Sequence, residues 1–530
     1  MLILACCVAW LVASQMQLAA AAHKDAPAPA QRETEMAAAI KLEVAQEVSK
    51  LRSSIGRSQD ASAHAAAQLT SAEQRAGGGG SGGGAKVCDP ADSDQHIVFS
   101  TGCNAFQHWQ AEVLLNSAMH AGQCGSMTRI VVGCDKKVVE VIRTHAGGAA
   151  DELISQSVLE RSTFPGLKVH VAPAIPEARE FPWFNKPWSF HHWLKEKGDS
   201  ITERAIAILD PDEFFLQPLT QRKGDKSADG FRILNNWPEA MASQVTDVVK
   251  PGMAVCQEYG LGTVWLHMFD KTKICPGGAS SPCAKMDQRQ GMLHYPCGPP
   301  YIFENGDFRK VMPTWWELMK PVYAQDKGDI QADMYAYVYA AIHHDVKHVV
   351  LQNYMVSNVD VGADGGGEGW PLIDKIQSMS CHNPLLPAGT PRPGFVHAAG
   401  HYKACTKGDP IKYQANECPE HEGSVLWNFH KGHVPSTILN CDEPLIMTPP
   451  DDLYNVQYTP RGKRSAFLMC NLIFMINRAA TDYKKKFCKP GYQLKKCTRI
   501  ITGNPGPPPP KSPGNPWGYP LAKVVPECMK

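Results

Sequence analysis

Short apolar runs alternate with segments of helical periodicity from residue 96 onward. Two helices are expected, over residues 106–122, ending at Gly122, and over 186–198, with Pro187 in the first turn. The runs typical of buried strands are "HIVFST" (96–101), "TRIVVGC" (128–134), "LKVHVAP" (167–173) and "RAIAILD" (204–210). This alternation predicts an α/β domain with a mainly parallel sheet, helices on both faces, and ligands at the carboxyl ends of the strands.

The first 22 residues carry a targeting pattern. An apolar run from Leu2 to Ala13 is followed by small residues that a signal peptidase could accept. Residues 1–22 are therefore predicted to be a cleaved signal peptide or a retained single-pass signal anchor, and the pattern leaves both open. Either one directs the protein to the secretory pathway, to the lumen of the Golgi or the ER.

A helical stalk is predicted over residues 23–85. One apolar stripe runs along it, made by Met36, Ile40, Val44, Val48, Leu51 and Ile55. The stripe either pairs two copies of the chain in a homodimer or belongs to a loosely helical spacer. The low-complexity segment "GGGGSGGG" (77–84) is a flexible linker, so the folded domain is expected to start near Lys86.

The predicted main domain covers residues 86–460 and is followed by a C-terminal extension over 461–502. In the extension, "AFLMCNLIFMI" (466–476) is too short to cross a membrane and indicates a core helix or strand. Residues 503–530 are rich in proline and glycine, which predicts an extended tail without a catalytic core.

Composition narrows the class of protein. The chain has 530 residues, is 43% hydrophobic, and carries a formal net charge of +1, which gives no support for nucleic-acid binding. Of its 18 cysteines, 16 lie from Cys88 onward, and this even number after an export signal predicts disulfides. No two of the 16 form a C-x-x-C pair, which argues against zinc, while the pairing stays open.

The stretch "AIAILDPDEFF" (205–215) ends a buried strand in three acids. Asp210 and Asp212, two residues apart at a strand end, can hold Mg²⁺ or Mn²⁺, which would stabilise the charge of a departing diphosphate. His397 ends a short apolar run in "GFVHAAGHYK" and is a candidate third ligand, with His401 four residues on. The competing interpretations are a solvated turn for the acids and a structural role for the histidine.

Several stretches together resemble a known family. They are "FSTGC", "WQAEVL", "TRIV", "NKPWSFHHWL", "ILDPDEFFLQPL", "GPPYIF", "MPTWWELM", "DMYAYVYAAIHH", "FVHAAGHY" and "WNFHKG". From about His96 to Pro450 the chain is similar to the plant and algal hydroxyproline O-arabinosyltransferases and the related peptidyl-serine α-galactosyltransferases. The surroundings of Asp212 look more like the arabinosyltransferase branch, although Asp210 stands where that branch has a glutamate.

The resemblance implies a GT-A-like, Rossmann-like fold and a metal-dependent, retaining glycosyltransferase. The donor would be a UDP-sugar, with arabinofuranose favoured, the metal Mn²⁺ or Mg²⁺, and the acceptor hydroxyproline of a hydroxyproline-rich glycoprotein. Asp210, Asp212 and His397 match the metal and diphosphate positions. Asp333 in "ADMYAY" falls where relatives carry an acid, which implies a catalytic contact with sugar or acceptor; the alternative is an acid that complements the dipole of a helix N-terminus.

Four further residues are candidates for binding. Trp427 and Lys431 in "WNFHKG" could close over the donor, with the lysine meeting phosphate charge. Asn185 and Lys186 lie between aromatic residues in "PWFNKPW" and could face the substrate. Ordinary packing is the competing interpretation for Trp427 and Lys431. Two alternative functions stay open: a peptidyl-serine α-galactosyltransferase, and a non-catalytic secreted matrix or binding protein with the same fold.

Overall fold

The chain divides into two units, Met1–Ala85 and Lys86–Lys530, and all residues described below belong to the second. The structure is a computed structural model, which describes residues 93–134, 161–219, 249–326, 331–352, 354–362, 366–387, 390–407, 426–489 and 498–499. The predicted signal or anchor (1–22), the stalk and linker (23–85) and the proline-rich tail (503–530) lie outside the described residues.

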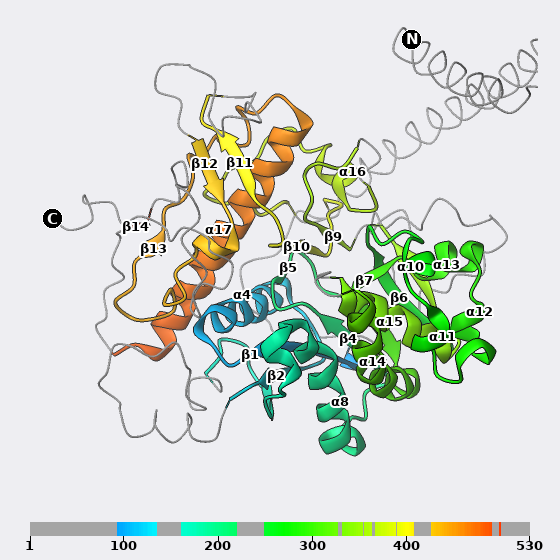
Figure 1. The fold of residues 1–530 in the computed structure, drawn as a ribbon. Helices are drawn as coiled ribbons and strands as arrows, with labels where there is room; N and C mark the ends of the chain where they lie inside the picture. The colour runs from blue at the N-terminus through cyan, green and yellow to red at the C-terminus, as the bar shows by residue number, and fades with distance from the viewer. Residues whose placement is uncertain are drawn as a thin grey trace, which may run out of the picture. The chain divides into compact units, whose positions relative to one another are not determined.

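A seven-stranded sheet forms the centre of this unit, in the order β3-β2-β1-β4-β7-β6-β8 (Figure 1). Its strands are β1 (Gln95–Gly102), β2 (Ser126–Val132), β3 (Lys168–Ala172), β4 (Ala205–Leu209), β6 (Met253–Glu258), β7 (Cys297–Glu304) and β8 (Lys347–Leu351). All pairs are parallel except those that β7 makes with β4 and β6. The predicted largely parallel sheet is confirmed, and so are its four predicted strands.

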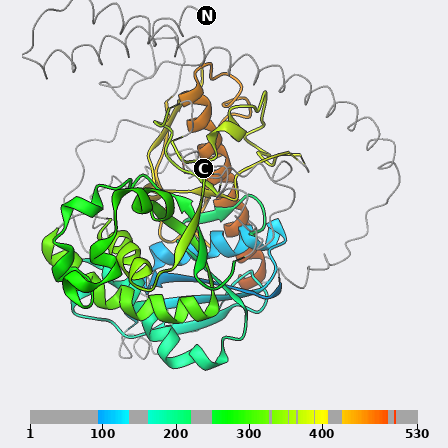
Figure 2. The ribbon, with the colours of Figure 1, turned by 90° about the vertical axis from the view of Figure 1, so that its right-hand side faces the viewer.

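Helices cover both faces of the sheet (Figures 1 and 2). One face carries α4 (Ala105–Ala121), on which α17 (Pro460–Phe487) packs. The other carries α8 (Asn185–Lys197), α14 (Asn305–Gln325) and α15 (Ala332–His343). The other α-helices of the described residues are α7 (Glu177–Glu180), α10 (Trp265–Met268), α11 (Lys271–Ile274), α12 (Pro282–Lys285), α13 (Gln288–His294) and α16 (Trp370–Ile373).

The two predicted helices are confirmed. Gly122 ends α4 with φ 74°, a left-handed conformation that glycine adopts without a steric cost. Pro187 lies in the first turn of α8, as predicted. The apolar run 466–476 is the middle of helix α17, which starts behind the N-cap Thr459 with Pro460 in its first turn. Of the two structures that this run allowed, helix or strand, it forms the helix.

Three smaller sheets accompany the central sheet in the described residues. The strands β5 (Glu213–Phe215), β10 (Phe395–His397) and β9 (Met355–Val356) form a three-stranded sheet in the order β5-β10-β9. Strand β11 (Tyr402–Cys405) pairs antiparallel with β12 (Leu426–Phe429), and β13 (Leu445–Ile446) pairs with β14 (Thr498–Arg499). Because β5 and β10 are antiparallel with Glu213 opposite His397, the turn after β4 is fixed against a segment almost two hundred residues later.

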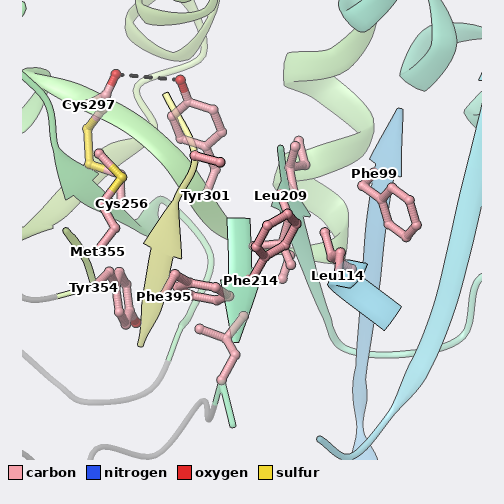
Figure 3. Packing of buried hydrophobic residues seen from close by; sticks show 14 of the residues in the cluster. Phe99, Leu114, Leu209, Phe214, Cys256, Cys297, Tyr301, Tyr354, Met355 and Phe395 are labelled. Carbon is pink, nitrogen blue, oxygen red and sulfur yellow. Dashed lines mark hydrogen bonds between the residues drawn. A yellow bond between two sulfur atoms is a disulfide. The ribbon is translucent and has the colours of Figure 1, made fainter. Parts of the chain in front are cut away.

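Buried apolar side chains surround this junction (Figure 3). Leu209 at the end of β4 and Phe214 in β5 lie on either side of the turn and are almost inaccessible to solvent. Phe215 packs on Phe395 of β10 with ring centroids 4.7 Å apart. Burial of such aromatic and aliphatic groups stabilises the fold by roughly 1.5–3 kcal/mol per side chain, so the turn is anchored on both sides.

Five disulfides join described residues, which confirms the interpretation of the cysteine count. They are Cys103–Cys134, Cys256–Cys297, Cys275–Cys283, Cys381–Cys470 and Cys441–Cys488. In the described part of the chain, no group of three or more His, Cys, Asp or Glu side chains is arranged to hold a metal ion. A membrane-spanning helix is likewise not found among these residues.

Candidate functional site

The turn between β4 and β5 contains Asp210, Pro211 and Asp212, followed by Glu213. The backbone N–H of Asp210 donates to the Glu213 carboxylate at 2.9 Å, and the backbone N–H of Glu213 donates to the Asp210 carbonyl at 3.1 Å. These two bonds close the turn on itself, and Pro211 has a restricted φ within it. The three acids therefore lie at the carboxyl end of a buried strand in a fixed arrangement.

Asp212 is the centre of the first group of charges. Its carboxylate is buried, and its two oxygens face Nζ of Lys431 at 2.5 Å and Nε2 of His397 at 3.5 Å. The backbone carbonyl of Asp212 accepts a hydrogen bond from the N–H of Ala398 at 3.0 Å. Burial alone would raise the pKa of Asp212, but the charges of Lys431 and His397 outweigh it and hold this pKa well below its usual value.

His397 is charged in this setting. Burial would lower its pKa, yet the carboxylates of Asp212, Glu213 and Asp210 raise the pKa to about 9. Its carbonyl accepts a hydrogen bond from the Tyr402 hydroxyl at 3.0 Å. The ring nitrogen Nδ1 is buried and has no hydrogen-bond partner among the described residues. A buried ring nitrogen without a partner is costly, and a bound ligand is one way to satisfy it.

Lys186 organises a second group of charges. Its Nζ lies 2.6 Å from Oδ1 of Asp210 and 3.6 Å from Oδ2 of Asp333. Burial would lower the pKa of Lys186, but these two carboxylates raise it above its usual value. Burial, with a contribution from the charge of Asp210, raises the pKa of Asp333 to about 6 although Lys186 opposes the shift. One lysine thus links the strand-end turn to α15.

Asp333 fits both interpretations of its sequence position. It lies in the first turn of α15, where an acid complements the helix dipole. Its side chain is also buried and turned to Lys186, so it belongs to the charge cluster at the end of β4.

Glu213, Tyr259 and Glu368 complete the cluster, and the sequence did not single them out as site residues. Burial and the charge of Asp210 raise the pKa of Glu213 to about 8. Burial, then the charges of Asp210, Glu213, Asp212 and Glu368, raise the pKa of Tyr259 well above its usual value. Tyr259 directly follows β6, so its position at a strand end was the only feature of the sequence that could have marked it as a site residue.

Two predicted residues have no direct link to the acids. Trp427 lies on β12 opposite Ala404, with a buried side chain, and Asn185 is the first residue of α8. Among the described residues, no hydrogen bond or ion pair joins either side chain to Asp210, Asp212 or Asp333. Lys186 and Lys431, the neighbours in their motifs, are the ones that reach the cluster.

The donor set suits a divalent cation by type. Asp210 and Asp212 offer carboxylate oxygens and His397 offers an imidazole nitrogen, which Mn²⁺ accepts. In the structure, Lys186 and Lys431 supply the positive charge beside the two carboxylates. The unpartnered Nδ1 of His397 is the observation that favours a further ligand at this place. The donor atoms of these residues are therefore of the types that the implied metal ion accepts.

Comparison with known proteins adds an independent observation. Residues 95–277 match the hydroxyproline O-arabinosyltransferase family N-terminal domain, and this segment contains β4, Lys186, Asp210 and Asp212. Over this segment the chain is similar to the hydroxyproline O-arabinosyltransferases. The resemblance read from the sequence motifs is thereby confirmed.

Three curated relatives carry the family name. Hydroxyproline O-arabinosyltransferase RDN1 from Medicago truncatula is 22% identical over 285 residues, which are 51% of this chain and 63% of the relative. Hydroxyproline O-arabinosyltransferase PLENTY from Lotus japonicus is 23% identical over 283 residues, and hydroxyproline O-arabinosyltransferase 3 from Arabidopsis thaliana is 21% identical over 272 residues. Each of these two matches covers 49% of this chain and 59% of the relative. The similarity to the arabinosyltransferases therefore spans about half of this chain and about three fifths of theirs.

Proposed function

We propose that this chain is a GT-A-like glycosyltransferase that transfers a sugar, with arabinofuranose favoured, from a UDP-sugar to hydroxyproline in a hydroxyproline-rich glycoprotein. One observation carries the proposal. The Asp210-Pro211-Asp212 turn lies in the segment that matches the arabinosyltransferase family, and Lys431 and His397 from outside that segment converge on Asp212. Acids at the carboxyl end of a buried strand in an α/β sheet are at the usual place for a ligand.

The two lysines are proposed to bind the diphosphate of the donor. Lys186 and Lys431 have side chains that are 15% and 28% exposed, so each is held by a carboxylate yet accessible from one side. A diphosphate accepts charge-assisted hydrogen bonds from such ammonium groups. The carboxylates keep both lysines ordered before the donor binds, which lowers the entropic cost of binding.

Mn²⁺ or Mg²⁺, when bound, would supply positive charge to the departing diphosphate. Asp210, Asp212 and His397 are the residues proposed to hold it. Asp212 is suited to this role because the positive charges beside it keep its carboxylate ionised. The oxygen donors of both aspartates support this assignment, and His397, whose Nε2 faces Asp212 at 3.5 Å, would give up a proton to bind the cation.

Transfer would break the bond between the anomeric carbon and the UDP oxygen and form a bond to the hydroxyproline oxygen, while the hydroxyl proton leaves with the UDP. Asp333 is proposed to contact the sugar or the acceptor hydroxyl, since its carboxylate faces the cluster through Lys186. Retention of the anomeric configuration is part of the proposal. The five disulfides favour an oxidising compartment, in keeping with the secretory pathway.

A donor screen tests the proposal. The purified full chain, with Mn²⁺ and a proline-rich peptide that contains hydroxyproline and serine, is given UDP-arabinofuranose or UDP-galactose, and the peptide mass is measured. A pentose on hydroxyproline is the expected result. A hexose on serine would instead identify a peptidyl-serine galactosyltransferase. If the chain binds neither UDP nor Mn²⁺, the non-catalytic matrix protein becomes the better explanation.

A further inference from the structure

A cavity of about 410 Å³ lies beside the charge cluster and has no part in the donor binding proposed above. Its lining includes Ala399 and Gly400, which follow His397 by two and three residues in the chain. Tyr259 and Glu368 also line it, and both interact electrostatically with the cluster. The cavity is therefore next to the place where the sugar would leave the donor.

The walls of the cavity are held in place by buried polar groups. The Glu368 carboxylate accepts hydrogen bonds from the backbone N–H and the hydroxyl of Ser357, both at 2.7 Å, and from the N–H of Asn358. The Gln257 side chain donates to the Gly367 carbonyl at 2.6 Å. Arg464 of α17 donates to the Val361 carbonyl at 2.8 Å. A cavity with walls fixed in this way is pre-formed for its ligand.

The chemistry of the lining excludes a diphosphate. Its charged side chains are the carboxylates of Glu258, Asp360 and Glu368, of which Asp360 pairs with Arg461. Among the described residues that line the cavity there is no lysine or arginine. An anion here would meet like charge, and like-charge contacts select against a ligand. The lysines that suit phosphate lie instead at Asp210 and Asp212.

We infer that this cavity is the acceptor subsite, which takes the hydroxyproline-bearing segment of a neutral or basic, extended proline-rich peptide. The inference rests on the proposed function. Amide and hydroxyl groups of such a segment find polar partners in Glu258 and Asn358, and the ring of Tyr259 offers an apolar face. Gly260 in the lining allows a close approach of the peptide backbone.

Gly260 gives a direct test. A Cβ built at this position meets no atom within 4 Å, so a side chain can begin here without a clash. In Gly260→Phe we expect the KM for the peptide to rise at least tenfold, while the Kd for UDP, measured by calorimetry, stays within twofold. Gly260→Ala is the matched control and should change neither constant by more than twofold. An unchanged peptide KM in Gly260→Phe, or a comparable loss of UDP affinity, would overturn the inference.

A second measurement varies the charge of the acceptor peptide and leaves the protein unchanged in its first step. Two hydroxyproline peptides that differ only in flanking lysine or glutamate residues are compared with the wild-type chain. The lysine peptide should have a KM at least fivefold lower, and the difference should shrink in Glu258→Gln. Equal KM values for the two peptides would contradict an acidic acceptor site.

A peptide-binding experiment tests the acceptor subsite independently of the proposed sugar transfer. If the wild-type chain transfers no sugar from any donor, calorimetry with the lysine peptide alone still reports on the cavity. Binding to the wild type that is lost in Gly260→Phe would support the peptide subsite even then. Absence of binding to the wild type would overturn it.

Discussion

Lys431 follows Asp212 by 219 residues in the chain, yet its Nζ lies 2.5 Å from the Asp212 carboxylate. The contact joins the segment that matches the arabinosyltransferase family to a segment well beyond it. His397 reaches the same carboxylate from a third part of the chain. The properties of Asp212 are therefore set by residues that no local motif contains, and the predictions begin with this group.

Replacing Asp212 by asparagine should lower sugar transfer at least about 100-fold, because the variant keeps the shape and loses the charge that the proposed cation and lysine need. Removal of one partner from a buried charge cluster costs roughly 3–5 kcal/mol, so the melting temperature should fall as well. Transfer rate and melting are measured on the same preparation. Asp199→Asn, in the exposed part of the 3-10 helix Gly198–Ser200, is the control and should change neither. Full activity in Asp212→Asn would disprove the assignment.

Lys431→Met should weaken UDP binding about tenfold, which corresponds to roughly 1.4 kcal/mol of binding free energy. The reason is the loss of a charge-assisted hydrogen bond to the diphosphate. Titration calorimetry with UDP measures the effect. Lys273, whose side chain is 76% exposed, provides the control variant Lys273→Met. If UDP affinity is the same in both variants, Lys431 does not contact the donor.

Removal of divalent metal with a chelator should abolish transfer, and added Mn²⁺ should restore it. Binding of Mn²⁺ itself is followed by electron paramagnetic resonance, which needs no activity. His397→Ala should lower the Mn²⁺ affinity by roughly tenfold or more, since losing one imidazole donor weakens the site. The control His382→Ala removes an exposed histidine. Equal Mn²⁺ affinity in the two variants would show that His397 is not a ligand.

Glu112 on α4 should make stability depend on pH. Its carboxylate is buried and accepts a hydrogen bond from the Thr163 N–H at 3.1 Å. Burial raises the pKa of Glu112 from 4.5 to about 7, although hydrogen bonds from Thr163 and Ser162 and the charge of Arg129 oppose this shift. The folded state then holds its proton more tightly than the unfolded state. This contribution is present below pH 4.5 and is lost as pH rises through about 7.

The variant Glu112→Gln removes that titration. Between pH 4.5 and 8, the free energy of unfolding of the wild type should fall by about 3 kcal/mol more than that of the variant. Denaturant unfolding at the two pH values measures the difference. Parallel pH profiles of the two proteins would mean that folding leaves the pKa of Glu112 unchanged.

The disulfide between Cys441 and Cys488, 47 residues apart, ties the end of α17 to the segment before it. In the chain-entropy treatment, replacing both cysteines by alanine should lower the free energy of unfolding by roughly 4 kcal/mol. Cys275–Cys283 spans 8 residues, and its double alanine variant should lose less, roughly 2.5 kcal/mol. Denaturant unfolding of both variants tests the order. A larger loss for the shorter loop would contradict the entropic explanation.

The sequence predicted those elements whose apolar pattern is long and regular, such as β1, β4 and α4. It did not predict β7 as a strand. The segment "CGPPYIFE" contains two prolines and a glycine, and proline is rare in central strands because it donates no hydrogen bond. Strands β5, β9 and β10 have only two or three residues each, too few to show an alternating pattern.

The sequence predicted which types of residue make up the site, but it did not predict which side chains pair with one another. Asp210 and Asp212 could be found because they directly follow a buried run, whereas the pairing of Lys186 with Asp210 and Asp333 depends on how α8 and α15 pack. Glu213 stood in the same motif, but only the turn geometry shows it bonded back to Asp210. The number of cysteines predicted disulfides, and only the fold could supply their pairing.

The position of β7 has a consequence for protein synthesis. The segment that matches the arabinosyltransferase family ends at residue 277, while β7 begins at Cys297 and lies between β4 and β6 in the sheet. As the chain leaves the ribosome, β4 therefore has one unpaired edge until Glu304 has been translated, and such an edge invites pairing with other chains. The segment that matches the family model is therefore not a complete sheet by itself, and the open edge of β4 is a place at which the incomplete chain can pair with another strand.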